Sequence, residues 1–229
     1  MQAIERKNVE RALNREKKRS EALLQSLLPA EVARKLQRDE PVVPSLYPNA
    51  SVLFCDLVGF TPLARDMEPA ALVELLNSIF STFDQLAQAH GLEKIKTIGD
   101  AYMAVAGVPT ALPAPATASA QMALDIFSKL EEINLANGTR LNFRIGISSG
   151  PVMAGIIGID KISFDLWGDT VNLASRLESH GRPGRIQVCE QTYNALRENY
   201  YLEEQGTPEI KGLGPTKTWF LHGKKFSTA

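Results

Sequence analysis

The segment "EKIKTIGDAYM", residues 93–103, predicts the element around which the fold is built. Apolar and polar residues alternate along residues 92–97 and again along residues 101–105, the pattern of two half-buried strands. Gly99 and Asp100 stand between the two runs and favour a tight turn. The segment therefore predicts a β-hairpin. Lys96 and Asp100 could form an ordinary ion pair across this turn, which would contribute little on a wet surface.

The segments on both sides of this hairpin predict an α+β fold. The predicted order is strand, helix, hairpin, helix and strand, that is β-α-β-β-α-β, which is the ferredoxin-like arrangement with helices on one face of an antiparallel sheet. The outer elements are a strand over 51–57, a helix over 62–90, a helix over 116–136 and a strand over 141–148. Hairpin-like strands at 152–157 and 162–167, a helix over 170–180 and a β-rich terminal portion follow.

The first forty residues differ from the rest of the chain. Residues 1–40 contain no glycine, carry many charges and have only a narrow apolar stripe, which is typical of a helix that pairs with another helix. Pro29 interrupts this helix, and residues 30–36 start a short second one. We therefore expect an N-terminal coiled-coil-like extension over 1–40, a linker with three prolines over 41–48, and one main domain over 49–229.

Composition excludes several classes of function. The hydrophobic fraction of 44%, the charged fraction of 22% and the net charge of −1 are typical of a soluble globular protein and give no case for nucleic-acid binding. Cys55 and Cys189 lie in apolar runs, so we expect buried free thiols and a cytoplasmic location. The three histidines are scattered, so no zinc site is expected. We also expect no membrane span and no signal peptide, because no apolar run is long enough.

Basic residues cluster between Arg6 and Arg19. They are compatible with a solvated coiled-coil face or with the cytoplasmic flank of a longer, membrane-anchored parent protein.

Two aspartates are candidates for a metal site. Asp56 ends the strand over 51–57, and in the ferredoxin-like order this strand lies beside the strand that follows the hairpin turn. We therefore expect Asp56 and Asp100 at neighbouring strand ends. Two such carboxylates would repel each other unless a cation lay between them, and oxygen ligands favour Mg²⁺ or Mn²⁺. Taken singly, Asp56 could instead be a helix cap and Asp100 a turn residue.

A phosphate site is expected beside the carboxylates. The turn "VGFT", residues 58–61, opens the predicted long helix, so the backbone N–H groups of Phe60 and Thr61 would point outward at the positive end of its dipole. A carboxylate pair beside such a turn is the layout of two-metal phosphoryl transfer.

Three motifs together resemble one known family. "SVLFCDLVGFT" (51–61), "EKIKTIGDAYMAVAG" (93–107) and "FDLWGDTVNLASRLES" (164–179) are similar to motifs of the class III nucleotidyl cyclases, over about residues 49–220. Members of this family cyclise a nucleoside triphosphate at a dimer interface, and each site draws residues from both chains. Three motifs in the right order make chance agreement improbable.

The resemblance implies a role for each matched residue. Asp56, the backbone carbonyl of Leu57 and Asp100 would hold two metal ions, while Lys96 and Asp165 would read the purine. A lysine donates to N1 of adenine and an aspartate accepts from its 6-amino group. Guanine presents the reverse pattern, and guanylyl cyclases of the family carry a glutamate and a small polar residue at these positions. The resemblance therefore implies ATP as the substrate.

The last implied residues lie further along the chain. Asn172 and Arg176 are four apart, hence on one face of a helix, where they could also be a solvated polar pair. By resemblance Asn172 would position the ribose, and Arg176 would stabilise charge on the α-phosphate. Lys211 matches a lysine that contacts phosphate, with Lys217 as a competing candidate.

These inferences predict an adenylyl cyclase that forms 3′,5′-cyclic AMP and pyrophosphate, as a homodimer with two shared sites. The sequence is also compatible with a sensor or membrane domain upstream in a longer parent protein. Two alternatives stay open. One is a guanylyl or mixed-specificity cyclase. The other is a catalytically silent nucleotide-binding regulatory domain, against which the presence of all six matched positions argues.

Overall fold

The computed structural model describes residues 2–207, 209–210 and 214–225. The chain divides into two compact units, one made of residues 1–45 and 154–165 and the other of residues 46–153 and 166–229.

The first unit contains the two N-terminal helices, α1 (Gln2–Leu27) and α2 (Ala30–Gln37). Pro29, with φ −52° and ψ 140°, separates them as the sequence predicts. Large apolar side chains of α1 remain exposed, Leu13 by 68% and Leu27 by 80%. The narrow apolar stripe of α1 is therefore available for contact with another helix.

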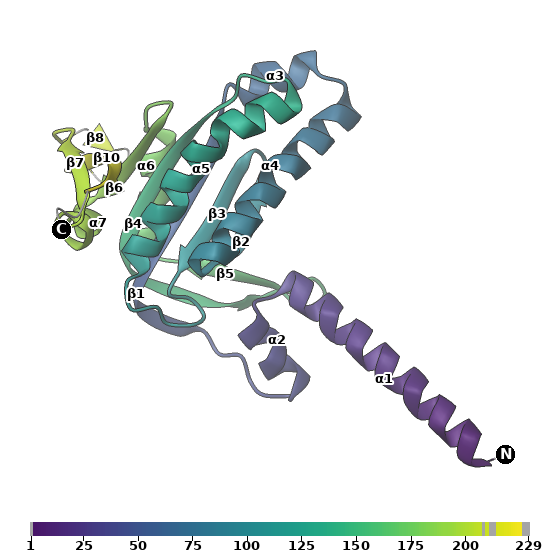
Figure 1. Ribbon diagram of the computed structural model, residues 1–229. Coiled ribbons are helices and arrows are strands. Elements are labelled where there is room, and N and C mark those ends of the chain that lie inside the picture. Colours follow the sequence, from purple (N-terminus) through teal and green to yellow (C-terminus); the bar gives the residue numbers. More distant parts are fainter. Residues whose placement is uncertain (1, 208, 211–213, 226–229) are drawn as a thin grey trace. The chain divides into compact units, whose positions relative to one another are not determined.

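An eight-stranded sheet carries the second unit, and Figure 1 shows its elements. The strand order is β2-β3-β1-β4-β6-β10-β7, and β5 (Ser163–Trp167) pairs with β4. Its first four strands are β1 (Ser45–Val58), β2 (Leu92–Ile98), β3 (Ala101–Ala106) and β4 (Asn142–Ile157). The order β-α-β-β-α-β is confirmed, and so is the position of β1 beside β3.

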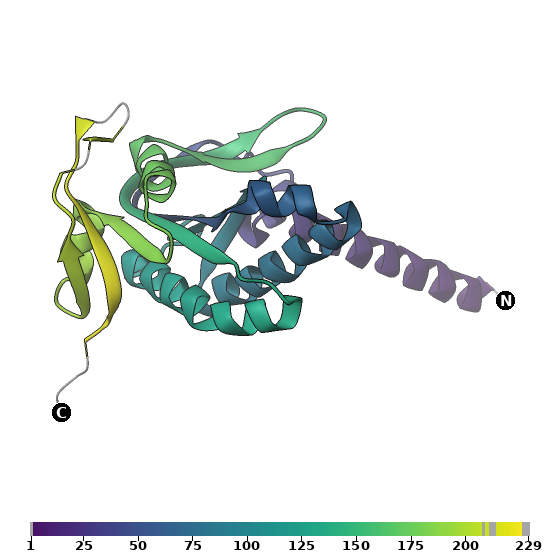
Figure 2. The same cartoon turned by 90° about the horizontal axis from the view of Figure 1, so that it is seen from above.

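Two helices cover one face of this sheet (Figures 1 and 2). They are α4 (Pro69–His90) and α5 (Pro115–Asn137), which end at Gly91 and Gly138 as predicted. The core between the helices and the strands contains alternate residues of each strand, so Leu53, Cys55, Tyr102 and Ala104 face the helices. This alternation assigns every residue of β1 and β3 to one face or the other.

The opposite face is crossed by α6 (Asp169–Ser179) at Gly146 of β4. Phe143, Ile145 and Ile147 of β4 belong to the core under α4 and α5, so Gly146 lies on the other side. A Cβ atom at Gly146 would lie 2.3 Å from the backbone nitrogen of Glu178 and 2.4 Å from the carbonyl oxygen of Ala174. The missing side chain therefore allows the backbone of α6 to contact the sheet.

The structure corrects three predicted boundaries. The helix over 62–90 is two helices, α3 (Phe60–Asp66) and α4, because Pro69 disfavours helical backbone at Glu68, whose side chain caps α4 through a 3.0 Å bond from Ala70 N–H. Strand β1 begins at Ser45, inside the expected linker. The separate strands over 141–148 and 152–157 are one strand, β4, because the φ that Pro151 requires is tolerated in extended backbone.

The C-terminal part completes the sheet. Strand β6 runs parallel to β4 and antiparallel to β10, which also pairs with β7. The bounds are β6 (Arg185–Cys189), α7 (Glu190–Leu196), β7 (Tyr200–Glu204), β8 (Glu209–Ile210), β9 (Gly214–Pro215) and β10 (Thr218–Lys224). Cys55 and Cys189 are both free and buried, as expected. Among the described residues, no helix is long and apolar enough to cross a membrane.

Candidate functional site

Asp56 and Asp100 meet at the end of the sheet. Asp56 pairs with Ala101 across β1 and β3, and Asp100 directly precedes Ala101 at the hairpin turn. Burial, and next the negative charge of Asp56, raise the pKa of Asp100 above its ordinary value. The predicted proximity of the two carboxylates is confirmed, and their repulsion favours binding of a positive charge beside them.

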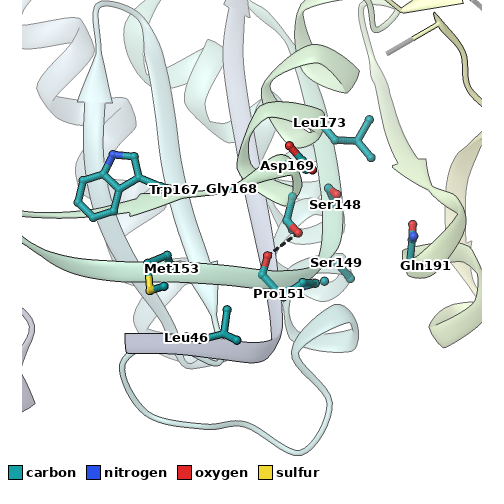
Figure 3. A pocket seen from close by; sticks show the side chains of 12 residues that line it. Leu46, Ser148, Ser149, Pro151, Met153, Trp167, Gly168, Asp169, Leu173 and Gln191 are labelled. Carbon is teal, nitrogen blue, oxygen red and sulfur yellow. Dashed lines mark hydrogen bonds between the residues drawn. The ribbon is translucent and has the colours of Figure 1, made fainter. Parts of the chain in front are cut away.

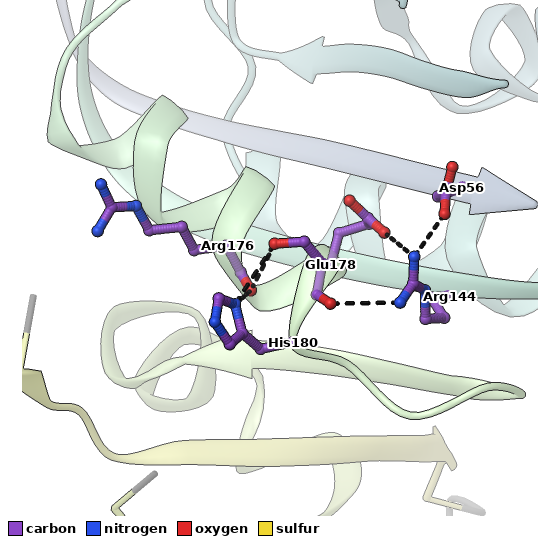
Figure 4. A network of polar contacts seen from close by, with 6 residues as sticks. Asp56, Arg144, Arg176, Glu178 and His180 are labelled. Atoms are coloured by element: carbon purple, nitrogen blue, oxygen red, sulfur yellow. Dashed lines mark hydrogen bonds and ion pairs between the residues drawn. The ribbon is translucent and has the colours of Figure 1, made fainter. Parts of the chain in front are cut away.

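Arg144 of β4 supplies one such charge (Figure 4). Its Nη2 atom lies 2.6 Å from Oδ2 of Asp56 and 3.3 Å from Oε1 of Glu178, and its Nη1 donates to the carbonyl oxygen of Ser179 over 3.2 Å. Neither Arg144 nor Glu178 is among the site residues that the sequence predicts. One signal was available, because Arg144 is the single charged residue in the strand predicted over 141–148 and a buried strand needs a partner for a charge.

The surroundings of Glu178 disfavour the ionised form of its side chain. Its side chain is 8% exposed, and burial followed by the charge of Asp56 raises its pKa to about 7, against the opposing effect of Arg144. Among the described residues, Nε of Arg144 has no hydrogen-bond partner, and Oε1 of Glu178 has the 3.3 Å ion pair with Arg144 but no well-formed hydrogen bond. Two carboxylates, those of Asp56 and Glu178, thus share one guanidinium, whose Nε could still donate to a further acceptor.

Arg176 points away from this cluster, as Figure 4 shows. It shares one face of α6 with Asn172, four residues earlier, and Asn172 is exposed. The Nη1 atom of Arg176 is buried and has no hydrogen-bond partner among the described residues. Within one chain, the structure therefore does not bring Arg176 together with Asp56 and Asp100.

The predicted phosphate turn opens α3 and not the long helix. Gly59 precedes α3 with φ 76° and ψ 20°, a left-handed conformation that favours glycine. Phe60 and Thr61 are the first two residues of α3, so their N–H groups have no partner within the helix. Because α3 has seven residues, its dipole is smaller than the long helix would have supplied.

The other predicted residues are placed as follows. Lys96 lies on β2 and Asp165 on β5, in different units of the chain. The side chain of Leu57 is buried in the core under the helices. Lys211 lies outside the described residues, whereas the competing Lys217 is exposed between β9 and β10.

A cavity of about 430 Å³ adjoins the first turn of α6 (Figure 3). Its lining includes Ser148, Ser149, Met153, Trp167 and Asp169. Thr170 closes one side, where its hydroxyl donates to the carbonyl oxygen of Pro151 over 2.7 Å. None of the sequence-predicted site residues lines this cavity.

The family model for the adenylate and guanylate cyclase catalytic domain matches residues 42–223. The chain belongs to this family. It is 43% identical to an adenylate cyclase of Mycobacterium tuberculosis over 94% of this chain and 49% of the relative. It is 39% identical to the human guanylate cyclase soluble subunit beta-2 over 90% of this chain and 34% of the relative. The chain thus spans half or less of the length of these curated relatives.

Solved structures of both kinds of cyclase share the fold. The guanylate cyclase domain of RhGC from Catenaria anguillulae, in complex with GTP, has a TM-score of 0.77 at 34% identity and covers 79% of this chain and 100% of its own. The adenylyl cyclase CyaB from P. aeruginosa has a TM-score of 0.76 at 27% identity, covering 82% and 100%. The family and its ferredoxin-like core are therefore established, whereas the choice between purines depends on the chain's own residues.

Proposed function

We propose that this chain converts ATP to 3′,5′-cyclic AMP and pyrophosphate. In this reaction the ribose 3′ oxygen forms a bond to the α-phosphorus, the bond to the pyrophosphate oxygen breaks, and the hydroxyl proton is released. The observation that carries the proposal is the Asp56–Asp100 pair at the ends of β1 and the hairpin, within a cyclase catalytic domain.

The carboxylate pair fits divalent cations. Among the described residues, no three histidine, cysteine, aspartate or glutamate side chains form a metal site, so oxygens of the triphosphate and the Leu57 carbonyl would complete the ligand set. Bound there, two ions, Mg²⁺ or Mn²⁺, would neutralise the triphosphate and favour ionisation of the 3′-hydroxyl. Asp56 and Asp100 would hold these ions, because a cation would relieve their mutual repulsion, which after burial is the second cause of the raised pKa of Asp100.

The purine would be read by Lys96 and Asp165. Lys96 donates to N1 of adenine, and Asp165 accepts from the 6-amino group. With guanine, both side chains would face groups of the same hydrogen-bonding type and leave buried polar groups unpaired, which discriminates strongly.

The transition state would be stabilised from a second copy of the chain. Because Arg176 points away from Asp56 within one chain, we place the partner's Arg176 and the partner's Asn172 at the α-phosphate and the ribose. The unpartnered, buried Nη1 of Arg176 supports a role in binding an anion. The N–H groups of Phe60 and Thr61, together with Lys211, would hold the remaining phosphates.

The N-terminal helix would support this dimer. The exposed leucines of α1 suit a coiled coil, which would also transmit a signal from an upstream domain in a longer parent. The buried free thiols and the use of ATP support a cytoplasmic location.

The test is product formation by the purified chain from ATP and from GTP, with Mg²⁺ and with Mn²⁺, at several protein concentrations. We expect cyclic AMP from ATP, with specific activity that rises with protein concentration until the dimer is saturated. Predominant cyclic GMP would favour a guanylyl cyclase, a candidate that the human relative's name supports. No product from either nucleotide would favour a silent regulatory domain.

A further inference from the structure

Strand β2 contains one residue more than β3 over the length in which the two strands pair. Leu92 pairs with Ala106, Lys94 with Ala104 and Lys96 with Met103, and the register shifts between the two lysines. Ile95 is the additional residue, so a β-bulge separates Lys94 from Lys96.

The bulge puts the two lysines on opposite faces of the sheet. Lys94 lies opposite Ala104, which belongs to the core under α4 and α5. Its Nζ atom is 2.8 Å from Oδ1 of Asp84 on α4 and 5.3 Å from the ring centre of Tyr102, which also faces the helices. Lys96 lies opposite Met103, the residue between Tyr102 and Ala104, and therefore faces away from the helices.

Asp56 shares the face of Lys96. On β1, Cys55 and Leu57 belong to the core under the helices, so Asp56 between them faces the other way. Its partner on β3 is Ala101, two residues from Met103 and on the same face. Counted from the turn, Ile98 pairs with Ala101, Thr97 with Tyr102 and Lys96 with Met103, and without the bulge Lys94 would pair with Val105 and face away from the helices.

We infer that the two-residue spacing between Lys96 and the Gly99–Asp100 turn determines which lysine reads the purine, because it pairs Lys96 with Met103 on the face that carries Asp56, while the bulge at Ile95 turns Lys94 toward the helices. This inference rests on the proposed function. The side chain of Ile95 has no part in it, and only the number of residues between Lys96 and the turn matters. Bulges commonly re-aim a side chain beside an active site.

Two deletions of one residue separate this inference from a general effect of shortening β2. Deleting Ile95 leaves a regular strand in which Lys94 still pairs with Ala104 and Lys96 with Met103. Deleting Thr97 also leaves a regular strand, but Lys96 then pairs with Tyr102 and faces the helices. Both variants have the same length, keep the Gly99–Asp100 turn, and differ from each other at only two positions.

We expect the Thr97 deletion to lower the ratio of kcat/KM for ATP to that for GTP by roughly tenfold or more, the value of a lost hydrogen bond to a charged group. The Ile95 deletion should keep the ratio of the parent chain within about threefold, in line with a charge-assisted bond retained. NMR contacts between residue 96 and Met103 or Tyr102 report the register of both variants without reference to activity.

The inference is overturned if the Thr97 deletion, with the register shifted, keeps the ATP preference, or if a folded Ile95 deletion loses it. Should the Thr97 deletion fail to fold, loss of the ATP preference in a folded Ile95 deletion would still overturn the inference. Single substitutions test the proposed function separately. Lys96→Ala should lose the ATP preference and Lys94→Ala should keep it. A preference unchanged in Lys96→Ala would mean that this lysine does not read the base, whatever its register.

Discussion

Two regions of the second unit differ in how directly their sequences reveal them. The hairpin end, made of Asp56 on β1 and Asp100 in the turn between β2 and β3, follows from alternation and turn chemistry. The crossing of β4 and α6, where Arg144 and Glu178 lie, shows no such pattern. The difference is one of distance along the chain, because hairpin partners are a few residues apart, whereas Arg144 and Asp56 are 88 apart. Local patterns report local pairing, and they do not report which distant backbone approaches.

The largest expected effects come from one substitution in each of the two regions. Asp56→Ala at the hairpin end, and Arg176→Ala on α6, should each lower turnover by roughly a thousandfold, since each removes several kcal/mol of charge stabilisation. Steady-state cyclic AMP formation measures this, and circular dichroism shows whether the fold persists. Near wild-type activity of Asp56→Ala would contradict its role in holding metal.

Mixing the two variants then tests whether the regions act across chains. In a mixed dimer both lesions fall in one site, and the other site is intact. With free exchange at equal concentrations, half the dimers are mixed, so activity should recover to roughly a quarter of wild type. Exchange is verified with differently tagged chains. Absence of recovery despite exchange would place the complete site within one chain.

A smaller effect concerns the purine. Lys96→Glu combined with Asp165→Cys should reduce the ATP preference by roughly 10- to 100-fold, because adenine then meets unpaired groups. Competition between ATP and GTP in one reaction measures the ratio. The single variant Asp165→Cys is the control for damage at β5. An unaltered ratio in the double variant would remove both residues from base reading.

The β4–α6 crossing should be sensitive to a single methyl group. Gly146→Ala places a Cβ against the backbone of Glu178 and Ala174, and overpacking of this kind costs about 1–3 kcal/mol. Gly223→Ala in β10 is the matched control, because nothing lies within 4 Å of its Cβ position. Calorimetry should show a Tm lowered by roughly 2–4 °C per kcal/mol for Gly146→Ala alone. Equal Tm values for the two variants would show that α6 can shift without cost.

The smallest expected effect is a pH dependence of stability. The pKa of Glu178 is raised to about 7 when folded, above its ordinary value of 4.5, so its contribution to stability is lost as pH rises through 7. In a chelating buffer, Glu178→Gln should therefore stabilise the chain by about 1 kcal/mol at pH 8 and by less at pH 5. Urea unfolding at both values measures the difference, with exposed Glu74→Gln as the control. A difference that is independent of pH would mean that Glu178 is ionised throughout.

The sequence by itself determined the order of elements, the hairpin and the nearness of Asp56 to Asp100. Helix and strand periods and turn residues act over a few positions, and the β-α-β-β-α-β order leaves few topologies. The interruption of the helix before Pro69 is also a local effect. The proline that causes it is visible in the sequence, although a continuous helix over 62–90 was predicted.

Only the tertiary structure decided the rest. Nothing in the sequence distinguishes Gly146 from the other glycines, because only the folded chain brings α6 against it. Arg144 contacts Asp56 and Glu178 only after β4 and α6 have packed together. Lys94 and Lys96 look equivalent in a strand of period two, yet one unpaired residue directs them to opposite faces. The physical reason is the same in each case, since side-chain surroundings depend on register and on backbone approach between segments, and these are set by packing of the whole sheet.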